Sequence, residues 1–171
     1  MAAWLVGLVI GAGKKTISTA IDEFQGVAHR LEFVRTWKNS DWYNDSKATT
    51  PEQTLAAIRS FDEPLVLLIG GRDKKLPWRD LIELIQERVR LVILFGEASE
   101  MIEQAFETLP NQRRKILIEK NKSMQEAVVT ASNLVKPGDI VLFSPGGTSF
   151  DEFLDFEERG ERFKQWVLEL S

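Results

Sequence analysis

The stretch WYNDSKATTPEQTLAAI, residues 42–58, sets the organisation of this chain. Its first two residues are aromatic and favour a β-strand, because such side chains pack well on a pleated sheet. The polar residues 44–49, NDSKAT, favour a loop. A helix is expected next, with Thr50 as its N-cap and Pro51 at its first position. This order of elements is typical of an α/β protein, which often carries functional side chains on such a loop.

The composition narrows the class of protein. An apolar fraction of 43% in 171 residues is enough for one domain with a true core. A net charge of -4 gives no basic surface for nucleic acid. The absence of cysteine excludes disulfides and thiolate metal sites, and a single histidine argues against a histidine-based site, so no bound metal is expected.

The N-terminal residues 1–20 begin with an apolar run. This run is interrupted by Gly7, has no basic residue in front of it and is too short to cross a bilayer, so we expect a soluble protein. The lack of cysteine fits a reducing compartment, and a cytoplasmic location is expected. The stretch Gly11–Thr16 is similar to a phosphate-binding P-loop. That motif requires Ser or Thr where Lys15 stands and Gly where Leu8 stands, so we expect a turn between two helices instead.

Strand-like and helix-like segments alternate along the rest of the chain. Residues 31–37 and 41–44 indicate a hairpin, and the continuous apolar runs at 65–69 and 91–95 indicate strands buried on both faces. We expect further strands at 116–118 and 140–143, and helices at 16–24, 51–60, 79–88, around 101–106, at 124–135 and from 149 onward. The pattern predicts an α/β, Rossmann-like three-layer domain, with a mostly parallel sheet of about six strands, an antiparallel hairpin at one edge and helices on both faces.

Three expected loops lie at the carboxyl ends of strands, where open α/β sheets bind ligands. Asn44–Thr49 carries an acid and a cation, Gly70–Lys75 carries two glycines that let a ligand approach the backbone, and Ser144–Ser149 carries glycines and hydroxyls. Ser149 and Glu152 have the spacing of a capping box, as do Ser123 and Glu126, so a helix N-terminus is expected behind the third loop. The three loops together predict a site for a carboxylate or a phosphate.

Each loop also has a plain alternative. The polar residues 44–49 could form only a solvated turn, and Gly70-Gly71 could only end a strand. Ser149 could serve only as a helix cap, and Lys74 and Lys75 could be solvated surface lysines. Taken singly, none of these features is specific.

Several motifs, taken together and in order, resemble one family. They are Phe24-x-Gly26-x-x-His29-Arg30-x-Glu32, Asn44-Asp45-Ser46-Lys47-Ala48-Thr49, Gly70-Gly71 followed by Lys74, Ser144-Pro145-x-x-x-Ser149-Phe150-Asp151-x-Phe153, and Phe156-Glu157-x-Arg159-Gly160. Across nearly the whole chain they resemble the C-terminal domain of the Mur ligases, in particular the members that add D-glutamate. Sister ligases tend to have His where Lys47 stands. The resemblance implies that residues 1–27 are the last helices of the family's central ATPase domain and that 28–171 are the C-terminal glutamate ligase domain.

The resemblance implies an ATP-dependent ligation in peptidoglycan precursor synthesis. ATP would phosphorylate the terminal carboxylate of UDP-N-acetylmuramoyl-L-alanine, and the amine of D-glutamate would attack the acyl phosphate to form an amide. ATP and Mg²⁺ would be bound mainly by the central domain. The family's P-loop, its magnesium-binding residues and its UDP-sugar domain are absent from these residues, so we expect a monomeric piece of a longer enzyme, inactive alone.

The same resemblance, carried over residue by residue, implies a set of site residues. Arg30 and Asp45 would contact the nucleotide, and Lys47 would act as the catalytic residue near the phosphates. The residues expected to hold D-glutamate are Thr49, Lys74, Ser149, Phe150 and Phe156. Of these, Phe150 would contribute its backbone N–H at a helix start and Phe156 an apolar wall. One departure from the family pattern is Gly146-Gly147-Thr148, which stands in place of a usual Ala-Cys-Ala type of tripeptide and bears on loop stiffness.

Two other functions remain open at this point. One is a related Mur or folylpolyglutamate-type ligase domain that takes another amino acid, and the other is a stand-alone carboxylate-binding module. Selectivity among D-glutamate, L-glutamate and D-alanine would distinguish the first from a D-glutamate ligase.

Overall fold

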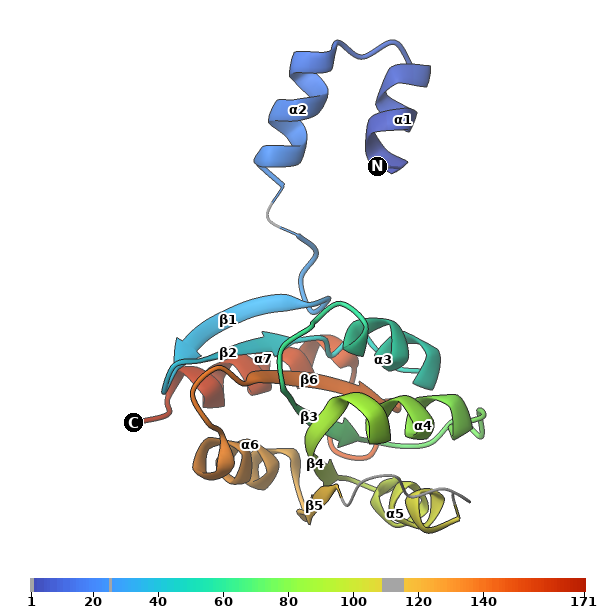
Figure 1. Ribbon diagram of the computed structural model, residues 1–171, viewed down its shortest axis with the longest axis vertical. Helices are drawn as coiled ribbons and strands as arrows, with labels where there is room; N and C mark the ends of the chain where they lie inside the picture. Colours follow the sequence, from blue (N-terminus) through green and yellow to red (C-terminus); the bar gives the residue numbers. More distant parts are fainter. Residues whose placement is uncertain (1, 25, 109–115) are drawn as a thin grey trace.

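The computed structural model describes residues 2–24, 26–108 and 116–171 (Figure 1). Met1 and Gln25, which belong to the expected N-terminal segment, lie outside the described residues. The elements in chain order are α1 (Ala2–Val9), α2 (Lys14–Asp22), β1 (Glu32–Trp37), β2 (Ser40–Asn44), α3 (Pro51–Ile58), β3 (Leu65–Gly70), α4 (Arg79–Arg88), β4 (Val89–Phe95), α5 (Ser99–Glu107), β5 (Leu117–Lys120), α6 (Met124–Leu134), β6 (Ile140–Gly146) and α7 (Phe156–Leu168).

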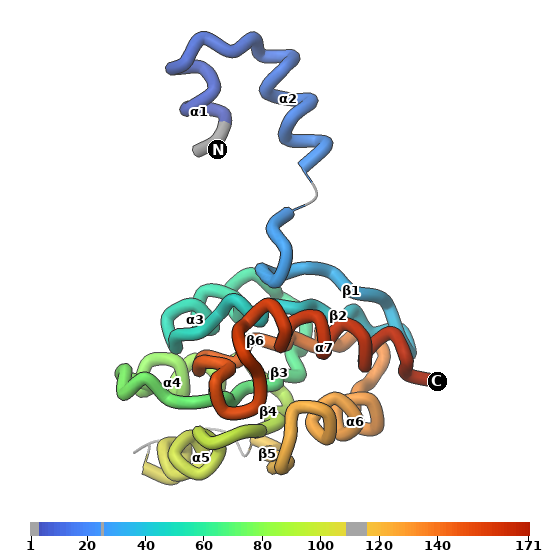
Figure 2. Tube along the Cα trace, turned by 180° about the vertical axis from the view of Figure 1, so that it is seen from behind, coloured from blue at the N-terminus to red at the C-terminus, as the bar shows by residue number. Residues whose placement is uncertain are grey.

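One six-stranded sheet organises the domain, in the order β1-β2-β6-β3-β4-β5. Only β1 and β2 pair antiparallel, and they form the edge hairpin that the sequence predicts. The chain first steps outward from β3 to β4 to β5 and then returns through α6 to β6, which lies between β2 and β3. Because crossovers are right-handed, this reversal puts helices on both faces of the sheet (Figures 1 and 2). The predicted fold class is confirmed.

Two apolar layers enclose the sheet. Every residue of β3 is buried, since its side chains alternate between the two layers. Leu67 packs with α3, α4 and α5, whereas Leu68 packs with α6 and α7. On the second face the rings of Phe143 and Phe163 stack at 4.4 Å between centroids. The two layers therefore pack on both faces of β3 and β6, whose carboxyl ends carry two of the three candidate loops.

The helices α1 and α2 form a hairpin that stands away from the sheet domain (Figure 2). The turn between them is the one expected in place of a P-loop. Ile17 packs so closely on Gly7 that a Cβ added there would lie 2.8 Å from the Ile17 side chain. Other apolar side chains of this segment stay open to solvent, since Ile21 and Phe24 are 42% and 66% exposed. Among the described residues, no helix combines the length and the hydrophobicity that crossing a membrane requires.

The expected start of the last helix is wrong. The helix α7 begins at Phe156, and its N-cap is Asp155, whose carboxylate accepts a hydrogen bond from Glu158 N at 2.7 Å. Ser149 instead opens a tight turn, in which its carbonyl accepts from the backbone of Phe153 at 2.8 Å. The carboxylate of Glu152 does not reach back to Ser149 but accepts from Met124 N. A distant helix start thus takes the carboxylate that local spacing assigned to a capping box.

The other caps follow the sequence more closely. Ser123 Oγ accepts from Glu126 N at 3.3 Å, as the predicted capping box requires. Thr50 occupies the N-cap position of α3, but its side chain makes no capping hydrogen bond. Gln53 instead accepts a hydrogen bond from Thr49 N at 2.8 Å and ties the polar loop to α3.

Candidate functional site

Three strand-end loops meet at the carboxyl edge of the sheet. They are the β2 loop (45–50), the β3 loop (71–78) and the β6 loop (147–155). The backbone of Ala48 accepts a hydrogen bond from Gly146 N at 2.9 Å, which joins the β2 loop to the end of β6. Arg72 and Thr148 exchange two backbone hydrogen bonds of 2.9 Å, which join the β3 and β6 loops. The loops therefore form one continuous layer.

Glycines allow this close approach between the loops. Gly71 has a φ of +89°, and a Cβ at this position would lie 2.3 Å from the carbonyl oxygen of Thr148. A Cβ on Gly147 would lie 2.6 Å from the carbonyl oxygen of Gly70. Gly70 and Gly71 were expected to let a ligand approach the backbone; a Cβ on Gly70 would meet the backbone of Phe95 at the end of β4, and one on Gly71 would meet the β6 loop. A side chain at Gly71 or Gly147 would push the loops apart.

Asp45 is the carboxylate near these loops whose pKa is most perturbed. Its oxygens accept hydrogen bonds from Ser144 Oγ at 2.8 Å and from Leu31 N at 3.2 Å, and only 5% of its surface is exposed. Burial raises the pKa of Asp45 to about 6, although Ser144, Leu31 and the charge of Arg30 each act to lower it. The carboxylate is therefore fixed in place and can change its charge near neutral pH.

A cavity of about 160 Å³ opens beside Asp45. Its lining comprises Arg30, Leu31, Asp45, Lys47, Ala48, Gln53, Ala56, Ala57 and Ser60. The two residues predicted to bind nucleotide and the predicted catalytic lysine therefore share one cavity. Two cations can bind phosphate oxygens, and a carboxylate can accept from ribose hydroxyls, so the lining fits part of a nucleotide. No cluster of three or more possible metal ligands occurs in the described part of the chain.

Three of the residues expected to hold D-glutamate contact one another or Lys47, the predicted catalytic residue. The ammonium of Lys47 lies 5.5 Å from the centre of the Phe156 ring, a cation–π distance. Lys74 Nζ donates to Thr49 Oγ1 at 3.2 Å, so these two candidates also meet. Each pair joins the β2 loop to another element.

The remaining two candidates lie on the β6 loop. Ser149 is buried, whereas Phe150 is 60% exposed. Phe150 lies in a turn, because α7 begins only at Phe156, so the expectation that Phe150 offers an N–H at a helix start is wrong. Neither Ser149 nor Phe150 lines the cavity beside Asp45.

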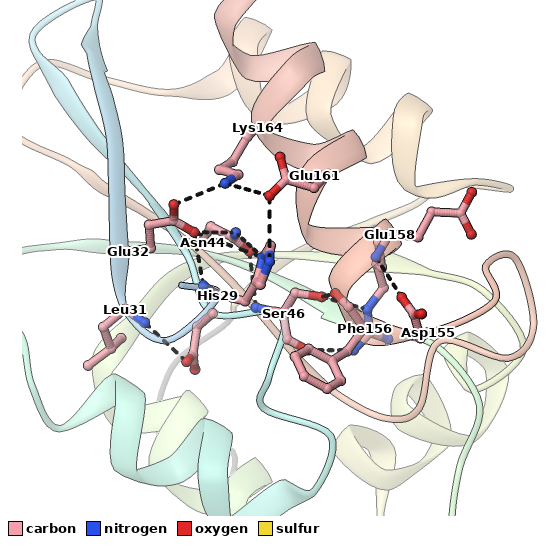
Figure 3. Close-up of polar contacts among 12 residues, drawn as sticks. His29, Leu31, Glu32, Asn44, Ser46, Asp155, Phe156, Glu158, Glu161 and Lys164 are labelled. Carbon is pink, nitrogen blue, oxygen red and sulfur yellow. Dashed lines mark hydrogen bonds and ion pairs between the residues drawn. The ribbon is translucent and has the colours of Figure 1, made fainter. Parts of the chain in front are cut away.

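Behind the β2 loop lies a polar network around His29, drawn in Figure 3. The amide nitrogen of Asn44 lies 3.0 Å from both His29 Nδ1 and the Glu32 carboxylate, while its oxygen accepts from Ser46 N at 3.1 Å. Because these contacts orient the Asn44 amide, His29 Nδ1 must be an acceptor and Nε2 carries the proton. Nε2 faces Glu161 at 3.6 Å.

This network acts on the cavity through the backbone. The carbonyl of His29 accepts from Lys47 N at 3.0 Å, and Arg30 is the next residue in the chain. His29 has a φ of +61°, an uncommon conformation that these contacts hold in place. No role was predicted from the sequence for His29 or for the buried Arg159, although both belong to the quoted motifs. Their burial became visible only in the fold.

Comparison with known proteins places the chain in a family. Residues 29–147 match the family described as Mur ligase, glutamate ligase domain, and the chain belongs to this family. A UDP-N-acetylmuramoylalanine--D-glutamate ligase of Chlorobium phaeobacteroides is 40% identical over 170 residues, which cover 99% of this chain and 35% of the relative. The chain thus spans about a third of the length of the curated relatives that it matches. The resemblance found in the sequence is confirmed.

Solved structures support the fold. The murein peptide ligase mpl of Psychrobacter arcticus has a TM-score of 0.60 at 16% identity, covering 96% of this chain and 35% of that chain. A folylpolyglutamate synthase of Mycobacterium tuberculosis, solved in complexes with ADP and AMPPCP, has a TM-score of 0.64 at 14% identity, covering 92% and 37%. At these identities the likeness shows the shared architecture alone.

Proposed function

We propose that this chain is the D-glutamate-binding domain of an ATP-dependent ligase that adds D-glutamate to UDP-N-acetylmuramoyl-L-alanine in peptidoglycan precursor synthesis. It acts in the cytoplasm as part of a longer protein, since its curated relatives are about three times as long. Residues 28–171 form the glutamate ligase domain, and the hairpin of α1 and α2 belongs to the preceding central domain.

The observation that carries this proposal is the shared cavity of Arg30, Asp45 and Lys47. Asp45 accepts from ribose hydroxyls, Arg30 binds the nucleotide, and Lys47 faces the phosphate that is transferred. A cation at this point stabilises the negative charge that develops as the acyl phosphate forms and is consumed. ATP and Mg²⁺ are bound mainly by the rest of the longer protein, where they supply the activated phosphate.

The amino-acid side of the site lies across the β2 loop. Lys74 and Thr49, in contact at 3.2 Å, offer a charge and a hydroxyl to a carboxylate of D-glutamate. Ser149 offers a second hydroxyl, and Phe150 and Phe156 supply apolar walls. Lys47, next to Phe156, then lies between the nucleotide and the amino acid.

A chimeric ligase tests this function. The first two thirds of the Chlorobium phaeobacteroides ligase are joined to residues 28–171, and ATP-dependent amide formation is measured with D-glutamate, L-glutamate and D-alanine. We expect product with D-glutamate, and none from the isolated chain. A preference for L-glutamate or D-alanine would replace the proposal with a related ligase of another specificity. Binding of all three by the isolated chain, with an inactive chimera, would favour a carboxylate-binding module.

A further inference from the structure

Arg159 is a cation in an unfavourable place. It has no solvent exposure and sits near the start of α7, where the positive end of the helix dipole disfavours a cation. Burial lowers the pKa of Arg159 to about 10, although the negative charges of Asp151 and Glu152 act to raise it, so it stays charged at neutral pH. Within residues 2–24, 26–108 and 116–171, no carboxylate forms an ion pair with it. A buried charge without an ion pair is costly unless its hydrogen bonds compensate.

Those hydrogen bonds all go to strand-end loops. Nε and Nη2 donate to the hydroxyl and the carbonyl of Ser46, at 3.0 Å and 2.8 Å. Nη1 donates to the carbonyl of Gly147 at 3.1 Å. The β3 loop lies beside the group, since a Cβ added to Gly71 would be 3.1 Å from Nη1. One guanidinium therefore bonds the β2 and β6 loops and lies next to the β3 loop.

The contact with Ser46 lies between the functional candidates. Ser46 separates Asp45 from Lys47 in the chain, and its hydroxyl, which accepts from Arg159, donates to the carbonyl of Phe156 at 2.8 Å. The planar fork of arginine fits this pair of oxygens, whereas the single ammonium of lysine cannot donate to three sites in one plane. The conformation of the β2 loop thus depends on Arg159 directly.

We propose that Arg159 is a positioning residue of the ligation, whose guanidinium holds the β2 loop, with Asp45 and Lys47, in alignment with the β6 loop, with Ser149. This inference rests on the proposed function. The reacting amine and acyl phosphate must approach to about 3–3.5 Å, and a misplacement of about 1 Å can lower the rate about 100-fold. Arg159 sets the alignment without contact with either substrate.

Hydrogen exchange of the 171-residue chain tests the structural half of this proposal. In Arg159→Ala we expect about tenfold faster exchange at the amides of Lys47 and Thr148, which donate to the carbonyls of His29 and Arg72, with no change in the centre of β3. Arg162→Ala is the matched control, since Arg162 is exposed on the same helix. Unchanged protection of the loop amides in Arg159→Ala would overturn the proposal, whatever the chimera does.

Activity of the chimeric ligase tests the functional half. At a temperature where circular dichroism shows the variants folded, Arg159→Ala should lower kcat about 100-fold, and added guanidinium, but not methylammonium, should restore part of it. Arg162→Ala should keep the parent kcat.

If Arg159→Ala does not fold, Arg159→Lys replaces it and is expected to fold but to lose kcat. A lower melting temperature with an unchanged kcat would show that Arg159 is only structural. An inactive parent chimera would refute the proposed function and, with it, this role in ligation, whereas exchange would still report whether Arg159 ties the loops.

Discussion

The carboxylate of Asp45 accepts a hydrogen bond from the hydroxyl of Ser144 at 2.8 Å, across a separation of 99 residues in the chain. The bond is buried and joins the end of β2 to β6, its neighbour in the sheet. It anchors the acid of the candidate nucleotide cavity to the most central part of the fold.

Asp45 should make stability depend on pH in an unusual direction. Its folded-state pKa of about 6 lies above the reference value of 3.8, so the folded protein binds this proton more tightly than the unfolded chain. The contribution is fully present below the reference value and is lost as the pH rises through 6. The unfolding free energy of Asp45→Asn minus that of wild type should therefore rise between pH 4 and pH 7.5, by at most about 3 kcal/mol. Urea unfolding at both pH values measures this gain, and equal differences at the two would contradict it.

The tautomer of His29 can be read directly. This is the only histidine in the chain, so its ring nitrogens give one set of ¹⁵N signals. We expect Nδ1 to be unprotonated and Nε2 to carry the proton in the neutral ring, because Asn44 donates to Nδ1. Two-bond ¹H–¹⁵N correlation spectra at pH 8 distinguish the two forms. A proton on Nδ1 would mean that the Asn44 amide is turned over, and the network behind Lys47 would have to be redrawn.

Lys74 should act on amino-acid binding alone. In the chimeric ligase, Lys74→Ala should raise the KM for D-glutamate about tenfold or more, since a charge-assisted hydrogen bond to the carboxylate is lost. The KM for ATP should change little, because Lys74 does not line the cavity beside Asp45. Lys75→Ala, at the exposed neighbouring position, is the control. An unchanged KM for D-glutamate in Lys74→Ala would remove this residue from the site.

Alanine substitutions at two glycines distinguish the cost of a strained backbone conformation from the cost of a clash between loops. Gly71 and Gly138 have φ values of +89° and +87°, but only at Gly71 would an added Cβ have neighbours within 4 Å. Gly138→Ala should cost about 1 kcal/mol of unfolding free energy, from the backbone conformation alone. Gly71→Ala should cost about 2 kcal/mol more, because the added methyl meets the carbonyl of Thr148. Equal losses in thermal or urea unfolding would show that the β3 and β6 loops can separate freely.

Local patterns predicted the fold where they were unambiguous. The apolar run at 65–69 became the buried β3, and the helix expected at 79–88 is α4. The capping box at Ser149 failed because its Glu152 lies beside α6, where a free N–H competes for the carboxylate. Spacing alone cannot identify such a competitor, since it lies 28 residues away in the sequence.

The amino-acid sequence by itself determined the alternation of elements, the edge hairpin and the family, because hydrophobic period, turn residues and ordered motifs are local properties of a chain. It also indicated Arg30 and Asp45 as contacts of the nucleotide and Lys47 as a residue near its phosphates. Only the tertiary structure decided that Gly71 and Gly147 face neighbouring loops, that Ser149 and Phe150 lie outside the cavity, and that Arg159 is buried and bonded to the β2 and β6 loops. These relations join segments far apart in the chain, and they exist only once the sheet has brought its strand ends together.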